Sequence, residues 1–544
     1  MARQGKSAII EQFLADGLTY MFGNPGTVEQ GFLDALEGYD GFQYILALQE
    51  TVAAGIADGY ARATGGPALL QIHSGVGLGN TIGMLYQSKR GHTPLVAIAG
   101  ESGVRYDAMD AQMAADLVAM ARPVTKYATR VVDPESVLRV LRRAVKIAMT
   151  PPRGPVFVAL PLDVLDAPNN EPVLRTAIPY TSVVPVPELV ERAAVLLAGA
   201  TNPIIILGDG VVVSGAQAAL THVAEQLGAD VWGADSSEVA IDSRHPLYRG
   251  LLGHMFGEVS AAAVAEADTV LVVGTYLFPE VFPTLSSPFR ADARIVHIDL
   301  DGYEIAKNHP VSLGLVADPK ATLEALATAL DRVMTPEDRQ RADARQEARR
   351  TQQSPVTVDE NSMLDVFLHA LAARAPEDLI VFDEGLTATP AISAHLPART
   401  PGHWFLTRGG SLGVGIPGAI GAKLAHPHRA VVGFTGDGGS MYTIQALATA
   451  ARYNIGAKFV ICNNHRYRLL DDNIAQYWRE RGIEQHEFPR SFDLSAPDIG
   501  FVDIARGCRV DAVRVEKPNQ VDEAIERMFA GDGPFLVDLV TAVG

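Results

Sequence analysis

Short apolar runs rich in β-branched residues recur along the whole chain, and they restrict its fold more than any other feature. Each run closes with Gly, Asp, Asn or Ser, and a stretch with helical periodicity separates it from the next. The runs stand at 68–75, 94–101, 155–163, 203–210, 269–275, 294–301, 379–385, 430–438, 458–464 and 534–540. Near-continuous apolar strands that alternate with helices are typical of parallel sheets covered on both faces. The sequence therefore predicts an α/β protein built from open parallel sheets.

Two weakly patterned segments divide this series of strands. Residues 166–190 are rich in proline, and residues 335–358 are charged and polar, which fits either a solvated helix or a flexible tether. For a chain of 544 residues, a prior of roughly one domain per 150 residues gives three or four domains. We predict three α/β domains, at 1–180, 185–335 and 358–544. Ligands of open parallel sheets bind at the carboxyl ends of the strands, so the residues that close these strands are the candidates for chemistry.

Charge and composition exclude several classes of partner. The formal net charge is −18 and no run of Lys or Arg occurs, which argues against a nucleic-acid or anionic-membrane surface. Residues 1–17 have the pattern of an amphipathic helix with acidic residues inside it, unlike a signal peptide, and no stretch approaches the ~18 apolar residues of a membrane span. Cys462 and Cys508 form neither a disulfide framework nor a zinc motif. We expect a cytoplasmic protein.

The most specific pattern lies between residues 430 and 467. A strand runs into Gly-Asp-Gly-Gly-Ser at 436–440, a helical pattern follows, and a second strand closes with two asparagines. A strand–helix–strand unit of this length brings Asp437 and Asn464 side by side. A carboxylate and an amide oxygen, with a backbone carbonyl, suit Mg²⁺ or Ca²⁺, and phosphate oxygens and water complete the shell. The glycines let a phosphate approach the backbone, and the helix N-terminus expected after Ser440 favours its negative charge.

This pattern resembles the cofactor motif of the thiamine-diphosphate-dependent enzymes, a GDG followed by NN after just under thirty residues. The resemblance implies thiamine diphosphate and Mg²⁺ as cofactors, with the metal on Asp437, Asn464 and the main-chain carbonyl of Arg466. It also implies a set of diphosphate contacts from two strand ends. These are Gly438, Gly439, Ser440 and, after the strand at 379–385, Thr387.

A second motif, residues 45–65, carries Glu50 after an apolar strand and at the start of a helix of small residues. A glutamate at a helix start is by itself a favourable partner of the helix dipole. The stretch resembles the glutamate motif of the same family, whose buried glutamate shares a proton with the 1′ ring nitrogen of the cofactor. The resemblance therefore implies that Glu50 activates the cofactor, whose own electronics perform the difficult step.

A third motif, residues 407–425, is rich in glycine. The family has a bulky apolar residue there that bends the cofactor into a V, which implies this role for Leu412, and the Gly410 carbonyl would accept from the cofactor's 4′-amino group. Tight packing alone is the open alternative. The resemblance further implies a pyrimidine-binding, a central and a diphosphate-binding domain. It also implies a homodimer or homotetramer, because relatives bind the cofactor between the first domain of one subunit and the third domain of its partner.

Within the family, the chain resembles the benzoylformate decarboxylase branch most, in FGNPGT at 22–27, HSG at 73–75 and ALATAARYNI at 446–455 among other stretches. This implies non-oxidative decarboxylation of a 2-oxo acid. His73, which closes a strand, would relay protons, although a lone histidine there is more often structural. Thr27 stands where that branch has a serine that binds the substrate carboxylate.

The substrate side departs from that branch. Val281 falls near the place of a second catalytic histidine, and Leu469 and Asn473 replace residues that shape a phenyl pocket. Another 2-oxo acid, or ligation to an acceptor aldehyde, is therefore equally open. One alternative is an acetolactate-synthase-like ligase, which usually binds FAD in the middle domain, although no G-x-G-x-x-G occurs at 203–216. The other is a catalytically inactive, nucleotide-binding subunit.

Overall fold

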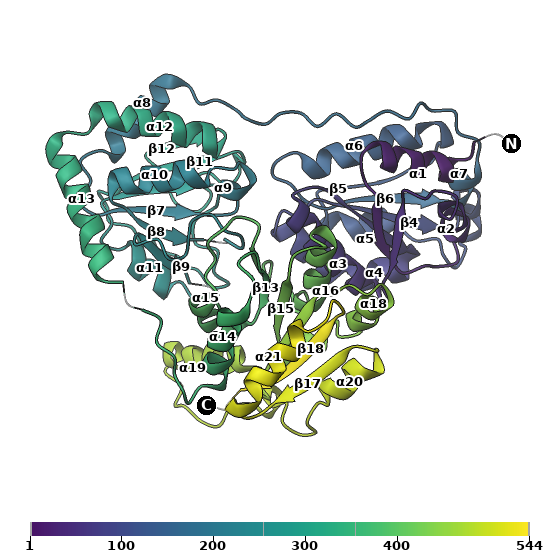
Figure 1. Ribbon diagram of the computed structural model, residues 1–544. Coiled ribbons are helices and arrows are strands. Elements are labelled where there is room, and N and C mark those ends of the chain that lie inside the picture. The colour runs from purple at the N-terminus through teal and green to yellow at the C-terminus, as the bar shows by residue number, and fades with distance from the viewer. Residues whose placement is uncertain (1–2, 235, 254, 354, 542–544) are drawn as a thin grey trace. The chain divides into compact units, whose positions relative to one another are not determined.

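Strands alternate with helices along the whole molecule (Figure 1). The computed structural model describes residues 3–234, 236–253, 255–353 and 355–541. The chain divides into two compact units. The first consists of Met1–Pro179, Asp359–Ala391 and Thr407–Gly544, and the second of Tyr180–Val358 and Ile392–Leu406. Three six-stranded sheets form the framework, and this confirms the predicted α/β class with parallel sheets.

The first sheet belongs to the first unit and has the strand order β2-β1-β3-β4-β6-β5, with every pair parallel. Its strands are β1 Tyr20–Gly23, β2 Gln43–Leu46, β3 Ala68–His73, β4 Leu95–Glu101, β5 Tyr127–Arg130 and β6 Val156–Pro161. The helices α1 Gly5–Ala15, α2 Gln30–Leu36 and α6 Val137–Met149 share one apolar core with it, together with Val164 and Leu165. On the strands also pack α3 Glu50–Thr64 and α4 Ser74–Arg90, with the shorter α5 Leu117–Ala121 and α7 Leu162–Asp166.

The second unit is built on a sheet of order β12-β11-β10-β7-β8-β9, again with parallel pairs. Its strands are β7 Pro203–Leu207, β8 Asp230–Gly233, β9 Tyr248–Leu251, β10 Thr269–Val273, β11 Arg294–Asp299 and β12 Leu313–Val316. The helices of its main core are α8 Pro187–Leu197, α9 Gly210–Val213, α10 Gln217–Leu227 and α12 Pro319–Val333. A smaller core lies under α11 Glu258–Val264 and the segment 277–289.

The third sheet has the order β14-β13-β15-β16-β18-β17. Its strands are β13 Ile380–Glu384, β14 Trp404–Leu406, β15 Val431–Gly436, β16 Lys458–Asn463, β17 Asp511–Val515 and β18 Phe535–Val540. The helices near it are α14 Met363–Arg374, α15 Thr389–His395, α16 Gly415–Ala425, α17 Asp437–Ser440, α18 Ala446–Arg452, α19 Arg468–Arg481, α20 Phe501–Gly507 and α21 Val521–Phe529. The pairs from β13 through β17 are parallel, so the carboxyl ends of these strands meet at one edge.

The strand predictions are confirmed, since every apolar run named from the sequence forms a strand. The predicted N-terminal helix is α1. Within residues 335–358, α13 Pro336–Thr351 starts with a capping box between Thr335 and Asp338. Of the two alternatives for this segment, the solvated helix is therefore confirmed over Pro336–Thr351, and a flexible tether is wrong for these residues. Residues 167–186 contain no helix or named strand (Figure 1). Within the described residues, no helix has both the length and the apolar character needed to cross a bilayer.

Helices α3 and α16, both in the first unit, pack backbone to backbone. A Cβ atom on Gly59 would lie 2.2 Å from the carbonyl oxygen of Gly418. A Cβ atom on Gly421 would lie 2.1 Å from the carbonyl oxygen of Ile56. No side chain fits between the two helices at these points, so the contact fixes the helix that starts at Glu50 against the helix that follows the glycine-rich motif.

Candidate functional site

Asp437 and Asn464 lie at the same edge of the third sheet. Gly436, the last residue of β15, pairs with Cys462 of β16, so the residues that follow both strands are neighbours. The N–H of Arg466 donates to the Oδ2 atom of Asp437 and to the Oδ1 atom of Asn464, at 3.0 Å each. The structure thus brings together a carboxylate oxygen and an amide oxygen around the backbone of a third predicted residue.

The chemistry of these donors fits a hard divalent cation. Burial raises the pKa of Asp437, and the N–H groups of Gly438 and Arg466 work against that shift. In the described part of the chain, no three His, Cys, Asp or Glu side chains form a metal-binding cluster. A cation here would therefore rely on one carboxylate, one amide oxygen and main-chain carbonyl oxygen, a set suited to Mg²⁺ with phosphate and water in the other positions.

The predicted diphosphate residues surround the same strand ends. Gly438, Gly439 and Ser440 are buried in α17, and a Cβ atom on Gly438 would lie 2.1 Å from the ring of Tyr467. Only a glycine permits that close approach of the loop after β16. Thr387 is exposed in the 3₁₀ turn Leu386–Ala388, which follows β13 at this edge.

The helix expected after Ser440 is α18. Ser440 closes the four-residue α17, and the next helix begins only at Ala446. Successive turns lie between them, because the N–H groups of Tyr442 and Thr443 bond to carbonyl oxygens three residues back. The Thr443 hydroxyl, moreover, donates to the carbonyl oxygen of Gly413 at 2.6 Å, which ties this segment to the glycine-rich motif.

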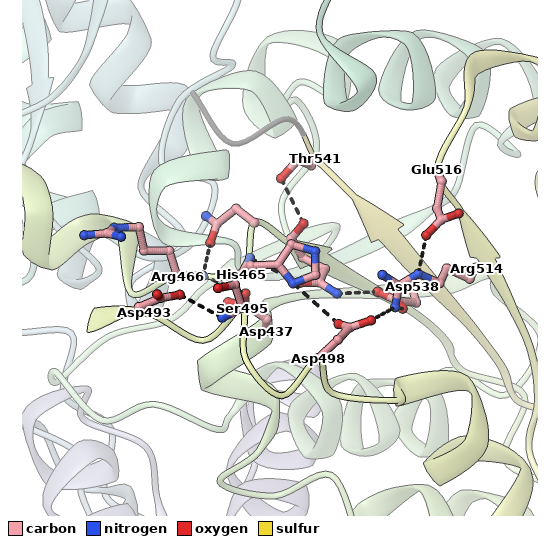
Figure 2. Close-up of polar contacts among 12 residues, drawn as sticks. Asp437, His465, Arg466, Asp493, Ser495, Asp498, Arg514, Glu516, Asp538 and Thr541 are labelled. Carbon is pink, nitrogen blue, oxygen red and sulfur yellow. Dashed lines mark hydrogen bonds and ion pairs between the residues drawn. The ribbon is translucent and has the colours of Figure 1, made fainter. Parts of the chain in front are cut away.

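A polar network that the sequence analysis missed anchors the loop after β16 (Figure 2). The Asn463 amide donates to Asp538 of β18 at 3.0 Å. Arg514 of β17 donates to Asp538 at 3.1 Å and pairs with Asp498 at 3.0 Å. His465 lies 3.5 Å from Asp498 and has a left-handed φ of +57°. The sequence feature that could have indicated this network is Asp538, an aspartate inside the otherwise apolar run 534–540.

The glycine-rich motif wraps a second residue that sequence reasoning missed. Glu384 closes β13, and its two carboxylate oxygens accept from the N–H groups of Gly413 and Gly415. Burial raises the pKa of Glu384 to about 7. Leu412 is partly buried next to this contact, and Gly410 is exposed with φ +81° and open space where a Cβ atom would stand. In the sequence, the two acidic residues that end the apolar run 379–385 could have indicated that Glu384 is buried at a strand end.

Glu50 is the first residue of α3 and only 5 % exposed. Its Oε1 atom accepts from the amide of Asn24 at 3.3 Å, and its Oε2 atom accepts from the amide of Asn80 at 3.0 Å. A Cβ atom on Gly77 would lie 3.0 Å from Oε1. The carboxylate is therefore buried and held by two neutral donors, one of them in the FGNPGT stretch.

His73 closes β3 beside Gly100 of β4. Its Nδ1 atom lies 2.9 Å from the Oε2 atom of Glu29, a buried residue that the sequence analysis did not name. Thr27 is exposed in the turn between β1 and α2. The spacing of His73 and Glu29, 44 residues apart, gives no local sequence signal for their contact.

The residues that depart from the benzoylformate decarboxylase pattern belong to two segments of the chain. Val281 is 55 % exposed in the second unit. Leu469 and Asn473 are partly buried on α19, directly after the loop that carries Asn464. The start of this helix is fixed by the ion pair of Arg466 with Asp471.

Glu50 and Asp437 have separate surroundings within one chain. The side-chain amides that donate to Glu50 come from the β1–α2 segment and α4, whereas the backbone N–H groups that donate to Asp437 come from α17 and the loop after β16. No hydrogen bond among the described residues joins the two carboxylates.

Comparison with known proteins identifies the family. Residues 3–120, 190–326 and 387–539 match the N-terminal TPP-binding, central and C-terminal TPP-binding domains of thiamine pyrophosphate enzymes. The chain is 32 % identical to a benzoylformate decarboxylase of Pseudomonas aeruginosa, with 98 % of both chains covered. The protein therefore belongs to the thiamine pyrophosphate enzymes, which confirms the resemblance stated from its motifs.

Two further relatives represent different chemistry in this family. The thiamine diphosphate-dependent 4-hydroxybenzoylformate decarboxylase of Rhodococcus jostii has a structure that matches with a TM-score of 0.87, at 29 % identity and with 100 % of both chains covered. The large subunit of acetolactate synthase isozyme 2 of Escherichia coli is 28 % identical, with 98 % of this chain and 94 % of the relative covered. The chain is thus similar to both decarboxylases and ligases.

Proposed function

We propose that the protein is a non-oxidative decarboxylase of a 2-oxo acid that uses thiamine diphosphate and Mg²⁺. The observation that carries this proposal is His73, an imidazole at a strand end in the unit that also holds Glu50, fixed at 2.9 Å by a buried carboxylate. Decarboxylation needs a group that exchanges a proton with the substrate, and a positioned histidine does so near neutral pH. The likeness to two decarboxylases of arylglyoxylic acids supports the same reaction.

The cofactor would be held by residues from two parts of the chain. Asp437, Asn464 and the Arg466 carbonyl would bind Mg²⁺, which neutralises the diphosphate. Gly438, Gly439, Ser440 and Thr387 would contact that diphosphate. When bound, the cofactor supplies the electron sink for cleavage of the carbon–carbon bond. Glu50 would hold a proton toward the 1′ ring nitrogen, Leu412 would support the bent cofactor, and the Gly410 carbonyl would accept from its amino group.

The substrate would be handled by two residues near β1 and β3. The Thr27 hydroxyl would bind the substrate carboxylate, and its exposed position in the turn leaves it accessible. Loss of CO₂ leaves a carbon that must take up one proton, and His73 would deliver it. Leu469 and Asn473 would shape the side-chain pocket, which favours a 2-oxo acid other than benzoylformate.

A ligase is the second candidate, since acetolactate synthases match the chain over nearly its whole length. One feature of the second unit favours the decarboxylase. At the carboxyl end of β7, the Asp209 carboxylate accepts from the N–H groups of Ser237 at 2.8 Å and Glu238 at 3.1 Å. The protein itself thus engages these two N–H groups, and residues 203–216 contain no G-x-G-x-x-G, so the segment after β7 lacks the phosphate-binding motif of a nucleotide-binding sheet. Purified ligase of the FAD-binding kind would show a flavin spectrum.

A catalytically inactive, nucleotide-binding subunit fits the residues less well. Such a chain has no need to retain Glu50, Asp437 and Asn464 together, and all three are present. Purified protein without cofactor and without turnover would favour it. We further propose a homodimer or homotetramer in the cytoplasm, where two unpaired cysteines are stable.

The direct experiment screens 2-oxo acids for CO₂ release with thiamine diphosphate and Mg²⁺, in the presence and absence of an acceptor aldehyde. Release of CO₂ with formation of a free aldehyde supports the decarboxylase. A product that appears only with the acceptor favours the ligase instead, and no turnover with any 2-oxo acid contradicts both.

The variant His73→Ala tests the role that carries the proposal. Turnover should fall by roughly 10²–10⁴-fold if the imidazole is a general acid or base. A decrease of less than tenfold, with intact cofactor binding, would assign His73 a structural role.

A further inference from the structure

The carboxylate of Glu29 is fixed from two sides. Its Oε1 atom accepts from the N–H of Gly100 at 2.9 Å, and its Oε2 atom lies 2.9 Å from the Nδ1 atom of His73. Glu29 is 3 % exposed, so water does not compete freely for either oxygen. Each oxygen therefore has one defined partner.

Two glycines make room for this pair. A Cβ atom on Gly26 would lie 1.9 Å from the Nδ1 atom of His73. A Cβ atom on Gly100 would lie 2.5 Å from the Oε1 atom of Glu29. The backbone at both positions has to lack a side chain for the ring and the carboxylate to meet, so the contact is built into the fold.

The arrangement determines which nitrogen of His73 carries the proton. An ionised carboxylate only accepts hydrogen bonds, and a neutral imidazole donates from one nitrogen and accepts at the other. Burial raises the pKa of Glu29, and the contact with His73 and the N–H of Gly100 oppose that shift. With the N–H of Gly100 as a donor to Oε1, the pair is satisfied when Glu29 is ionised. Nδ1 then donates to Glu29, and Nε2 keeps the lone pair.

We propose that Glu29 is a positioning residue that holds the neutral His73 ring with its proton on Nδ1, so that Nε2 exchanges protons with the substrate. The assignment of Nε2 of His73 as the nitrogen that faces the substrate rests on the proposed decarboxylase function. The tautomer itself does not, and it can be measured without substrate.

The variant Glu29→Gln should invert the tautomer. The N–H of Gly100 is a fixed donor, so the amide oxygen of the new side chain has to face it. The amide NH₂ group then faces Nδ1, which must accept, and the proton of His73 moves to Nε2. The two side chains have nearly the same shape, so the surroundings of the ring are preserved.

The test measures the tautomer by nitrogen-15 NMR on full-length protein labelled in histidine, at about pH 9, where an imidazole is neutral. The spectrum of His73→Asn identifies the signals of this ring. We expect protonated Nδ1 in the wild type and protonated Nε2 in Glu29→Gln. Protonated Nε2 in the wild type, or the same tautomer in both proteins, would overturn the proposal.

Kinetics provide the second measurement. In Glu29→Gln, kcat should fall by about 10²-fold or more, because the wrong nitrogen is protonated, while KM and thiamine diphosphate affinity stay within about twofold. The control Glu37→Gln changes an exposed glutamate at the end of α2 and should match the wild type. Unchanged kcat with an inverted tautomer would refute the role of Nε2. Absence of CO₂ release from every 2-oxo acid would refute the proposed function, and the NMR result would still decide the tautomer.

Discussion

At the residue scale, four buried carboxylates are each held by defined N–H donors. They are Glu29, Glu50, Glu384 and Asp437. A carboxylate that is buried without such donors costs several kcal/mol of stability, so these contacts are what permits burial. The donors are mostly backbone or amide N–H groups rather than Lys or Arg, so a cation, an imidazole or a cofactor can supply a further interaction with each carboxylate.

Glu50→Gln should abolish most of the activity and leave thiamine diphosphate binding intact. The amide keeps the size of the side chain but cannot supply the shared proton, and removal of a general acid or base typically costs 10²–10⁴-fold. CO₂ release and calorimetric titration with thiamine diphosphate measure the two properties. Full activity of this variant would contradict the role of Glu50, and Glu37→Gln is the matched control.

Gly26→Ala should lower turnover because the new Cβ atom would stand 1.9 Å from the His73 Nδ1 atom. The ring has to move away from Glu29, so we expect kcat to fall at least about tenfold, in the lower range for a misplaced acid or base. Gly507→Ala, with open space around its Cβ position, is the control. If Gly26→Ala and this control are equally active, the space beside His73 is not needed.

His297 should make the stability depend on pH. Burial on β11 lowers its pKa to about 4, against an ordinary value of about 6.5 when unfolded. Between these values the unfolded chain binds the additional proton, so the free energy of unfolding falls as the pH decreases through this window. The nearby Asp299, whose pKa burial raises to about 7, has the opposite effect: its stabilising contribution is present at acidic pH and is lost as the pH rises through 7.

A comparison of wild type with His297→Gln isolates the histidine from Asp299. From pH 7 to pH 5, the stability advantage of the wild type over the variant should shrink by about 2 kcal/mol. Urea unfolding at several pH values measures it. A difference that is independent of pH would mean that His297 titrates normally in the folded protein.

At the scale of elements, most interior strands were predictable and most edge strands were not; the exceptions are the four-residue interior strands β1 and β8, which were not named, and the edge strand β2, which was expected before Glu50. Interior strands such as β7 and β15 are buried on both faces and therefore read as unbroken apolar runs. Edge strands such as β9 and β12 are four residues long with alternating exposure, which local sequence does not distinguish from a loop.

The candidate site was predictable to the same extent. Asp437 and Asn464 could be identified from the sequence because each directly follows an interior strand. Glu29 and Asp538 were not assigned, because their partners His73 and Asn463 lie 44 and 75 residues away and only the strand register brings them together.

The contact between α3 and α16 should be sensitive to a single methyl group. Gly59→Ala would place a Cβ atom 2.2 Å from the Gly418 carbonyl oxygen, and backbone on both sides leaves little room to adjust. We expect a loss of about 1–3 kcal/mol in the free energy of unfolding, as for other overpacked interiors. In contrast, Gly83→Ala on the exposed face of α4 meets no atom and should stabilise by roughly 0.5–1 kcal/mol. Equal denaturation midpoints of both variants would contradict the close packing.

At the scale of the whole molecule, the surroundings of Glu50 and Asp437 bear on the proposed assembly. Within one chain, each carboxylate has its own set of donors, and none of the described hydrogen bonds connects them. As the resemblance to the family implies, we propose that a cofactor site combines Glu50 of one subunit with Asp437 of its partner. A symmetric dimer would contain two such sites, because a two-fold interface repeats every contact.

Subunit complementation tests this arrangement. Glu50→Gln and Asp437→Asn should each be inactive alone. In a dimer of one copy of each, one site combines the intact Glu50 with the intact Asp437 and the other site carries both substitutions. After random mixing through unfolding and refolding, or by co-expression, about a quarter of all sites should be intact, and activity should recover to about that fraction of wild type. Mixtures that stay inactive, while size-exclusion chromatography with differently tagged subunits shows mixed dimers, would place Glu50 and Asp437 of a single chain at one site.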